Sequence, residues 1–326
     1  MKKIMALVLA LLMVAAAPLA LASCSGKGEY TVGIIQLIQH EALDAATKGF
    51  KDVLIAEFGE ENIKFEEVNA QGDSTICTTA ATDLVNKNVD LILGNATAAL
   101  QAAANATETI PVLGTSITDY GTALNMEFKG GAVGGNISGT TDLAPLDQQA
   151  AMINELYPRA TYPKVGLLYC SAEPNSKYQV TVIREELKKL GYADADIKDF
   201  PFADSNDIGA VSKGASEFAD VLYVPTDNTA ASFGATIKDN IGNDPLIAGE
   251  SGICGLCGIA TLSIDYYELG KITGEMAVKI LKGEAKVGEL EIASVPAATI
   301  TKKYNTVRAA EIGFTAPEGY AALPTE

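Results

Sequence analysis

Basic side chains and histidine are scarce in this 326-residue sequence. Its 24 lysines and arginines face 41 aspartates and glutamates, which gives a formal net charge of −17, and His40 is the single histidine. A chain this acidic repels phosphate backbones, so we expect no nucleic-acid partner. One histidine cannot form a two-histidine zinc motif, and we expect no metal site.

Signals of catalysis are also missing. The sequence has no GxSxG nucleophile elbow and no carboxylate pair that indicates acid–base chemistry. The glycine-rich run 130–135 does not join a strand to a helix, as a dinucleotide-binding loop does. We therefore expect neither an enzyme nor a cofactor. Tryptophan is absent as well, which is either chance or suits a protein made when tryptophan is scarce.

The 5 cysteines are too few and too scattered for a disulfide-built scaffold. Cys254 and Cys257 form a lone CxxC motif, and Cys77 and Cys170 stand apart. Three interpretations of the motif are open: a metal or redox site, a loop disulfide, or plain buried thiols. The lack of two further zinc ligands favours buried thiols.

An export signal is present at the N-terminus. A basic start precedes an apolar run from 4 to about 17, shorter than the about 20 residues of a membrane-spanning helix. The following Leu21-Ala22-Ser23-Cys24 resembles a bacterial lipobox, in which Cys24 would be lipidated and become the first mature residue. The alternative is an ordinary secretory signal with a chance cysteine. We assign 1–23 to a signal peptide and 24–29 to a lipidated tether, and expect an extracytoplasmic protein that its lipid holds at the membrane.

Apolar periodicity alternates between strand and helix from residue 30 onward, and the cycle begins again at 164. This βαβα order predicts a parallel sheet with helices on both faces, present twice. We expect an α/β protein of two Rossmann-like lobes, with the Gly-, Thr- and Pro-rich stretch 130–147 as a crossing between them. The N-terminal lobe is assigned 30–142 and 265–286, and the C-terminal lobe 143–264 and 287–326.

Polar residues at the carboxyl ends of the predicted strands form the candidate ligand site, because two such sheet edges facing each other make a cleft. From the first lobe we select Gln36, Gln71, Asn95, Thr97, Thr115, Ser116 and Asp119. From the second lobe we select Ser171, Asn175, Asp227, Asn228, Glu250 and Asp265. A wider set at the same edges adds His40, Thr118, Glu173, Asp204 and Ser251.

Hydroxyls and amides dominate the first-lobe set, and carboxylates lie mainly in the second. Helices that begin near Thr97 and Ser116 would point N–H groups at a ligand carboxylate, while Asp227 and Glu250 would face its ammonium. This combination predicts an amino acid. The alternative is that such residues are helix caps and turn residues. Candidates for ring contacts with the ligand, or else for the core, are Tyr169, Phe202 and Tyr266.

Several segments resemble one family. The most specific is Val224-Pro225-Thr226-Asp227-Asn228-Thr229, and the others are 32–44, 69–73, 90–93, 102–107 and 266–270. From about Tyr30 to the C-terminus the chain is similar to the ABC transporter substrate-binding lipoproteins that include tryptophan- and tyrosine-binding members. The chain departs from them at Gly249-Glu250-Ser251-Gly252, where Ser-Asp-Glu-Gly is more usual.

The resemblance implies a type I periplasmic-binding-protein fold, in which two lobes joined by three crossings close on a ligand. It also implies that the cleft contains Gln36, Asn95, Thr115, Ser116 and Asp227. We expect a monomeric, lipid-anchored receptor that delivers an amino acid, tryptophan or tyrosine, to an ABC permease and its ATPase. An extracellular sensor for a signalling receptor, a binder of another solute such as a sugar, and a secreted hydrolase are the alternatives.

Overall fold

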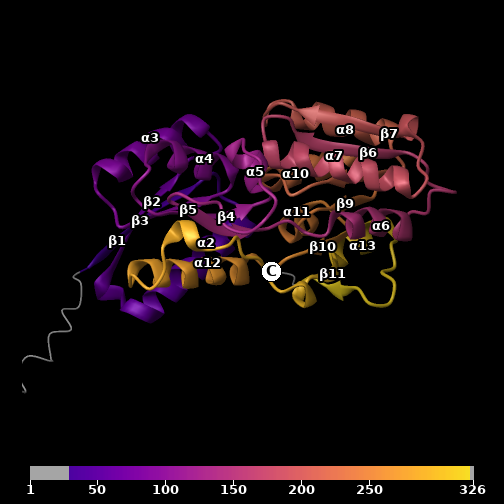
Figure 1. Ribbon diagram of the computed structural model, residues 1–326. Helices are drawn as coiled ribbons and strands as arrows, with labels where there is room; N and C mark the ends of the chain where they lie inside the picture. The colour runs from indigo at the N-terminus through magenta and orange to yellow at the C-terminus, as the bar shows by residue number, and fades with distance from the viewer. Residues whose placement is uncertain (1–28, 324–326) are drawn as a thin grey trace, which may run out of the picture.

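The computed structural model describes residues 29–323, which form two α/β lobes lying side by side (Figure 1). Each lobe has one sheet with helices packed on both faces, so the predicted α/β class with two Rossmann-like lobes is confirmed. The signal peptide and Cys24 lie outside the described residues. Within 29–323, no helix combines the length and the apolar character that crossing a membrane requires.

The first lobe holds a five-stranded parallel sheet. Its strands, in spatial order, are β2 (Ile63–Asn69), β1 (Tyr30–Gln36), β3 (Leu91–Asn95), β4 (Val112–Ile117) and β5 (Ile137–Thr141). Its helices are α2 (Glu41–Phe58), η1 (Glu60–Asn62), α3 (Ser74–Asn86), α4 (Thr97–Ala106), α5 (Tyr120–Leu124), α12 (Tyr266–Leu281) and η3 (Val287–Glu289). The central strands are buried on both faces, as their continuous apolar runs predict.

The second lobe holds a seven-stranded sheet, parallel except where β10 meets β11. Its strands, in spatial order, are β12 (Ala321–Ala322), β11 (Thr301–Tyr304), β10 (Ala260–Ser263), β9 (Leu246–Ala248), β8 (Val221–Val224), β6 (Val165–Cys170) and β7 (Ile197–Phe202). Its helices are α6 (Leu146–Leu156), α7 (Pro174–Lys189), η2 (Asp194–Asp196), α8 (Ile208–Phe218), α9 (Asn228–Ser232), α10 (Gly234–Ile241), α11 (Ser251–Leu256), η4 (Ala297–Thr299) and α13 (Thr306–Ile312).

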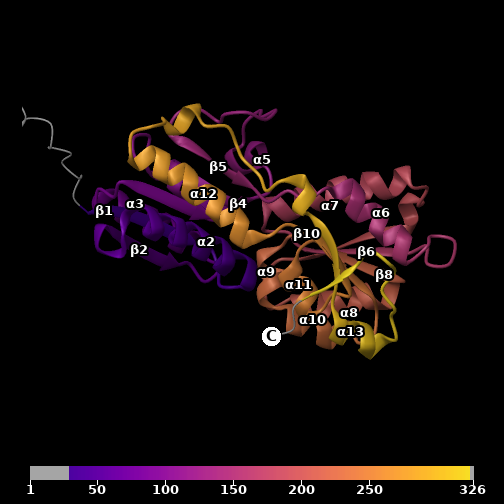
Figure 2. The ribbon, with the colours of Figure 1, turned by 90° about the horizontal axis from the view of Figure 1, so that it is seen from below.

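Helix α12 returns to the first lobe and lies along α2, far from it in sequence (Figure 2). Glycines permit this approach: a Cβ on Gly49 would lie 2.2 Å from the Tyr267 carbonyl oxygen, and one on Gly270 would lie 2.0 Å from that of Ala46. Side chains of α2 and α12 then cover one face of the first sheet together, including the fully buried Phe50. A helix from late in the sequence thus completes the hydrophobic core of the first lobe.

The chain crosses between the lobes three times within residues 29–323: after β5, after β10 and before β11. The prediction that 130–147 is the crossing was wrong for most of that stretch. Residues 137–141 form the fifth strand of the first sheet, which leaves 142–145 for the crossing. The segment from Val287 to Ala293, which we assigned to the second lobe, instead packs on the first, because Val287 is buried in its core and Ala293 pairs with Thr140.

Candidate functional site

The residues that follow the strands of the two sheets meet at one seam between the lobes. Hydrogen bonds across it join His40 Nε2 and Asn228 Oδ1 (3.3 Å), Gln179 Nε2 and Thr118 Oγ1 (3.4 Å), and Ser232 Oγ and the Gln39 carbonyl oxygen (3.3 Å). Since His40 follows β1 and Asn228 follows β8, the contacts lie at the carboxyl edges of both sheets. The structure therefore brings together the two edges at which the sequence places the ligand.

Five of the first-lobe candidates are buried at this edge: Gln36, Asn95, Thr97, Thr115 and Ser116. The hydroxyl oxygen of Thr115 accepts hydrogen bonds from Thr140 and Thr273 within the lobe, at 3.2 Å each. Gln71 is exposed after the edge strand β2, and Asp119 caps α5 by accepting a hydrogen bond from the Thr122 amide (2.7 Å).

Asn95 is held by a chain of side-chain hydrogen bonds. Gln36 Nε2 donates to Asp44 Oδ1 (2.6 Å), and Gln36 Oε1 accepts from the Thr47 hydroxyl (2.6 Å). Asn95 Nδ2 then donates to Thr47 Oγ1 and to the Leu43 carbonyl oxygen, at 2.9 Å each. We call these four side chains the Asp44 relay; it links α2 to the ends of β1 and β3.

Backbone strain concentrates at the same edge. Gln71, Ala96 and Ser116 have positive φ values of 55°, 84° and 57°, and they lie at or just after the ends of β2, β3 and β4 in the first sheet. A left-handed conformation costs a non-glycine residue about 1 kcal/mol or more and clusters at functional sites. The strained backbone therefore supports a functional role for this edge of the first sheet.

On the second lobe, Glu173 organises the turn after β8. Its carboxylate accepts hydrogen bonds from the amides of Asn228 (3.0 Å) and Thr229 (2.8 Å) and from the side chains of Asn228 (2.6 Å), Thr229 (2.8 Å) and Asn175 (3.2 Å). Glu173 is therefore saturated with donors and positions Asn228 toward His40. We placed Glu173 at this edge but not among the ligand-binding residues, since a structural carboxylate is indistinguishable in sequence from a ligand-facing one.

Helix capping accounts for several predicted residues. Asp227 caps α9, accepting from the Ala230 amide (2.8 Å) and also from the Cys170 amide (2.6 Å). Burial, and then the Glu173 charge, raise the pKa of Asp227 above its usual range. Asp265 is exposed and caps α12, and Ser171 donates its hydroxyl to the Phe202 carbonyl oxygen (3.1 Å).

Glu250 lies at the seam with unused capacity to accept hydrogen bonds. Its carboxylate caps α11 through the amides of Gly252 (2.6 Å) and Ile253, one to each oxygen. Burial, together with the charges of Glu41 and Asp142, raises the pKa of Glu250 to about 7, although the two amides lower it. Because Glu41 starts α2 and Asp142 lies in the first crossing, Glu250 faces the first lobe and the hinge.

Asp142 is the second carboxylate on that side of the seam, and it is buried. It accepts hydrogen bonds from the Thr118 hydroxyl (3.0 Å) and from Tyr266 (2.9 Å), which ties the first two crossings together. Burial raises the pKa of Asp142. Among the described residues, the ion pairs involve neither Asp142 nor Glu250. Buried acidic charge at the seam thus has no cation partner from residues 29–323.

Four buried polar atoms at the seam have no hydrogen-bond partner within residues 29–323. They come from both lobes: His40 Nδ1, Asn95 Oδ1, Ser116 Oγ and Ser251 Oγ. An unpaired buried polar group costs about 1–3 kcal/mol, so such a cluster at one place points to a ligand that satisfies it.

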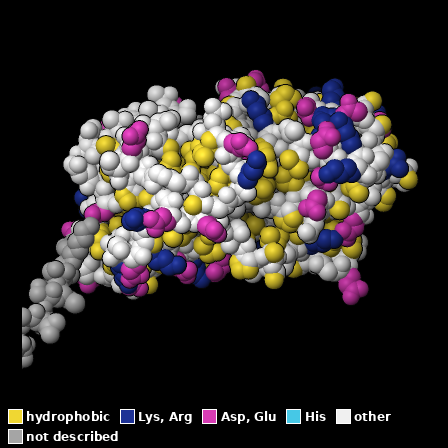
Figure 3. Space-filling model, in the orientation of Figure 1, with side chains coloured by type: hydrophobic (Ala, Val, Ile, Leu, Met, Phe, Trp, Pro, Cys, Tyr) yellow, Lys and Arg dark blue, Asp and Glu magenta, His cyan; other side chains and the backbone are white. Residues whose placement is uncertain are grey.

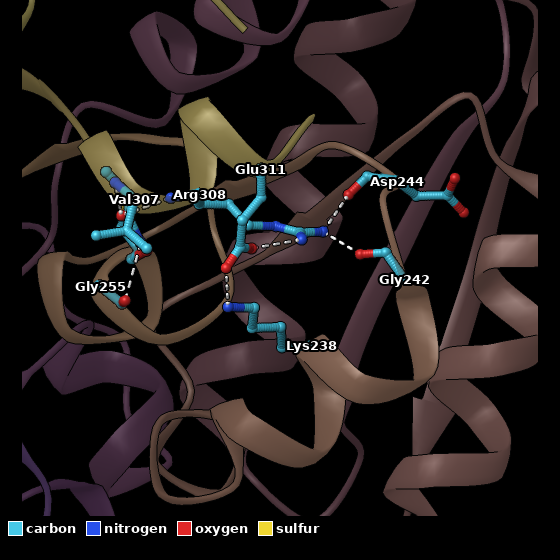
Figure 4. A network of polar contacts seen from close by, with 9 residues as sticks. Lys238, Gly242, Asp244, Gly255, Val307, Arg308 and Glu311 are labelled. Carbon is cyan, nitrogen blue, oxygen red and sulfur yellow. Dashed lines mark hydrogen bonds and ion pairs between the residues drawn. The ribbon is translucent and has the colours of Figure 1, made fainter. Parts of the chain in front are cut away.

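A cavity of about 670 Å³ opens at the seam, within the size range of small-molecule sites. Its lining includes His40 and Glu41 from the first lobe, and Ser251 and Arg308 from the second. The guanidinium NH₂ groups of Arg308 are held by the protein: they donate to the carbonyls of Gly242 and Asp244 and to Glu311 (3.1 Å), which also pairs with Lys238 (2.7 Å; Figure 4). This network fixes α13 against α10 as one wall of the cavity.

The cysteines and two of the aromatic candidates belong to the cores. Cys77, Cys170, Cys254 and Cys257 are buried free thiols, which agrees with the third interpretation of the CxxC motif. Burial raises the pKa of Cys257 to about 12, so it is a poor nucleophile. Phe202 and Tyr169 pack in second-lobe core clusters. Tyr266 is also buried in a cluster, with α2 and crossing residues, but its hydroxyl binds Asp142, so it is the candidate ring that lies at the seam.

Comparison with known proteins gives a consistent result. A model of the ABC transporter substrate-binding protein family matches residues 31–326. A tyrosine-binding protein of Clostridioides difficile (strain R20291) is 33% identical over 294 residues, which cover 88% of this chain and 82% of the relative.

Two solved structures share both sequence and fold with this chain. The ABC domain from Streptococcus pneumonia in complex with L-Trp is 31% identical with a TM-score of 0.83, covering 91% of this chain and 100% of its own. A ligand-free, open substrate-binding protein with adhesive properties from Clostridium difficile is 32% identical with a TM-score of 0.68, at the same coverage. The chain thus superposes better on the L-Trp complex than on the ligand-free, open structure, although the identities are nearly equal. The chain belongs to the ABC transporter substrate-binding protein family and has its type I periplasmic-binding-protein fold.

Proposed function

We propose that this protein is the lipid-anchored, extracytoplasmic receptor of an ABC importer and that it binds an aromatic amino acid, tryptophan or tyrosine. The observation that carries the proposal is the seam itself. Unpartnered polar atoms from both lobes surround it, and the buried carboxylates there lack a cation. The names of the tyrosine-binding relative and of the L-Trp complex support the ligand class.

An amino acid supplies both charges that this seam requires. Its ammonium pairs with Glu250, which has acceptor capacity left beyond its two backbone donors. Its carboxylate lies against the first lobe, where α4 begins at Thr97 and the Ser116 hydroxyl is unpartnered. The earlier alternative for the ammonium, Asp227, is weaker because its contacts with Cys170 and Ala230 and the neighbouring Glu173 charge all lie within the second lobe. Glu250 instead lies near the charges of Glu41 and Asp142, on the other side of the seam.

Binding works by closure, without covalent chemistry. Contacts such as His40 with Asn228 require both lobes, so they form when the lobes approach each other. A ligand that touches both lobes shifts the equilibrium toward the closed form, and the permease recognises that form. Figure 3 shows acidic and basic side chains interspersed on one face, with no large patch of either sign. This supports the lipid on Cys24, rather than a basic surface, as the membrane anchor.

A thermal-shift screen of the twenty amino acids tests the ligand. A ligand at 100 times its dissociation constant stabilises the folded state by about 2.7 kcal/mol. We expect the largest shifts with tryptophan and tyrosine and small ones with alanine. A sugar or glutamate that displaces tryptophan at equal concentration would refute the aromatic ligand. Unchanged uptake of the labelled amino acid by cells lacking this protein would favour the sensor alternative over the importer.

A further inference from the structure

The Asp44 relay fixes the orientation of the Asn95 side-chain amide. The Asp44 carboxylate and the Ile38 carbonyl oxygen can only accept, so the Gln36 NH₂ group must point at them. Gln36 Oε1 is then the acceptor for the Thr47 hydroxyl, which uses the single proton of that hydroxyl. Thr47 Oγ1 is left as an acceptor for Asn95.

The NH₂ group of Asn95 therefore points into the relay. One of its protons binds Thr47 Oγ1 and the other binds the Leu43 carbonyl oxygen, which is itself only an acceptor. Turning the amide over would set two oxygens against each other at 2.9 Å. Asn95 Oδ1 consequently faces away from the relay as a pure acceptor. Asn95 is fully buried, and this oxygen has no partner among residues 29–323.

We propose that Asn95 determines specificity by accepting a hydrogen bond from the side chain of the ligand: the ring N–H of tryptophan or the O–H of tyrosine. This inference rests on the proposed function, in which the ammonium already has the Glu250 carboxylate. A neutral amide oxygen matches a neutral donor, whereas an ammonium favours a carboxylate. After the ammonium, the donor that distinguishes these two amino acids from phenylalanine is the one on the ring.

The expected selectivity is large because a site built around a buried acceptor is penalised when a ligand leaves it unpaired. The first experiment compares ligands of matched shape on the purified full chain by calorimetry: tyrosine against phenylalanine, and tryptophan against its benzothiophene analogue, in which sulfur replaces the ring N–H. We expect each donor-free ligand to bind at least about tenfold more weakly. If the donor-free and donor-bearing ligands bind with nearly equal dissociation constants, the inference is overturned. Asn95 Oδ1 would then accept its hydrogen bond from another group, such as the ligand ammonium or a water.

The second experiment changes the protein. Asn95→Leu keeps the approximate size of the side chain and removes the acceptor, so the phenylalanine-to-tyrosine ratio of dissociation constants should fall to within about threefold of one. Thr273→Val is the matched control, because Thr273 is a buried first-lobe hydroxyl bonded to Thr115 and Thr140 and should leave the ratio unchanged. A ratio that persists in Asn95→Leu would overturn the role of Asn95.

The two proposals fail separately. Tight binding of tryptophan and tyrosine without discrimination against the donor-free analogues would keep the proposed function and remove the role of Asn95. Binding of none of these aromatic amino acids would remove both. If Asn95→Leu does not fold, the ligand series on the unaltered protein still decides the question.

Discussion

The ammonium contact proposed for Glu250 makes binding depend on pH. Burial raises the pKa of Glu250 to about 7, and a protonated Glu250 cannot pair with an ammonium. Protons therefore compete with the ligand below that pH. Between pH 8 and pH 5.5 the affinity should fall by about thirtyfold, since each pH unit below the pKa costs nearly tenfold.

Glu250→Gln isolates this effect. The amide retains one oxygen to cap α11 but carries no charge, and a charge-assisted hydrogen bond contributes about 1.5–3 kcal/mol. At pH 8 the variant should bind the amino acid about ten- to 150-fold more weakly, and its affinity should change little with pH. Isothermal calorimetry at several pH values measures both quantities. Glu41→Gln should shift this pH dependence to lower pH, because the Glu41 charge contributes to the raised pKa of Glu250. Glu289→Gln, which removes an exposed first-lobe charge, is the control and should leave the pH dependence as it is.

The stability of the ligand-free protein should respond in the opposite direction. A carboxyl group whose pKa is raised by folding stabilises the folded state at low pH, and that stability is lost as the pH rises through about 7. Burial lowers the pKa of His40 from 6.5, so the neutral His40 cannot produce a transition near pH 7. Parallel pH curves for the unaltered protein and Glu250→Gln, in binding and in urea unfolding, would refute the assignment of Glu250.

Four further predictions follow from the sequence and the packing. Cys24→Ser should abolish lipid attachment, because only the thiol forms a thioether; acylated protein retained in the membrane fraction would contradict the lipobox. Gly270→Ala should lower the free energy of unfolding by about 1–3 kcal/mol in urea, since its methyl group meets α2 backbone at 2.0 Å. Asp227→Asn should lower stability by about 1 kcal/mol and change affinity less; the reverse would restore Asp227 as the ammonium partner. Cys254 and Cys257 should react with a thiol reagent in denaturant but not in the native protein, where both are buried.

The sequence predicts the parallel core of the fold well because its strands are buried on both faces. Apolar runs reveal β1, β3 and β4, and α2 extends over 41–58 as its amphipathic period predicts. The apolar runs place two of these strands at 89–93 and 110–113, but β3 and β4 begin two residues later, since apolar residues that lead into a strand look like the strand itself. The apolar pattern over 228–240 predicts one helix, whereas the structure has two, α9 and α10, because the chain leaves helical geometry at Phe233.

Short or non-local elements escape such patterns. Strand β5 has the sequence of a loop, rich in Gly and Thr, and becomes a strand because β4 offers an edge to pair with. The packing of 287–293 on the first lobe likewise depends on partners far away, such as Tyr30 in the same core cluster. Neither feature has a local signal in the sequence.

In the candidate site, too, the sequence predicts where polar residues lie but not the contacts that decide their roles. The strand-end rule selects Asn95, Ser116 and Glu250 from the sequence, because the carboxyl edge of a parallel sheet is set by the order of elements alone. The rule cannot tell a cap from a ligand contact, since Asp227 and Glu250 both follow a strand and begin a helix. What separates them is their surroundings in the folded chain: Asp227 lies among second-lobe groups such as Glu173, whereas Glu250 lies near Glu41 and Asp142. For Asn95, the orientation of the side-chain amide is set by Asp44, which acts through the two intervening side chains of Gln36 and Thr47. The sequence alone cannot reveal this, because these residues come into contact only when α2 has packed on the sheet.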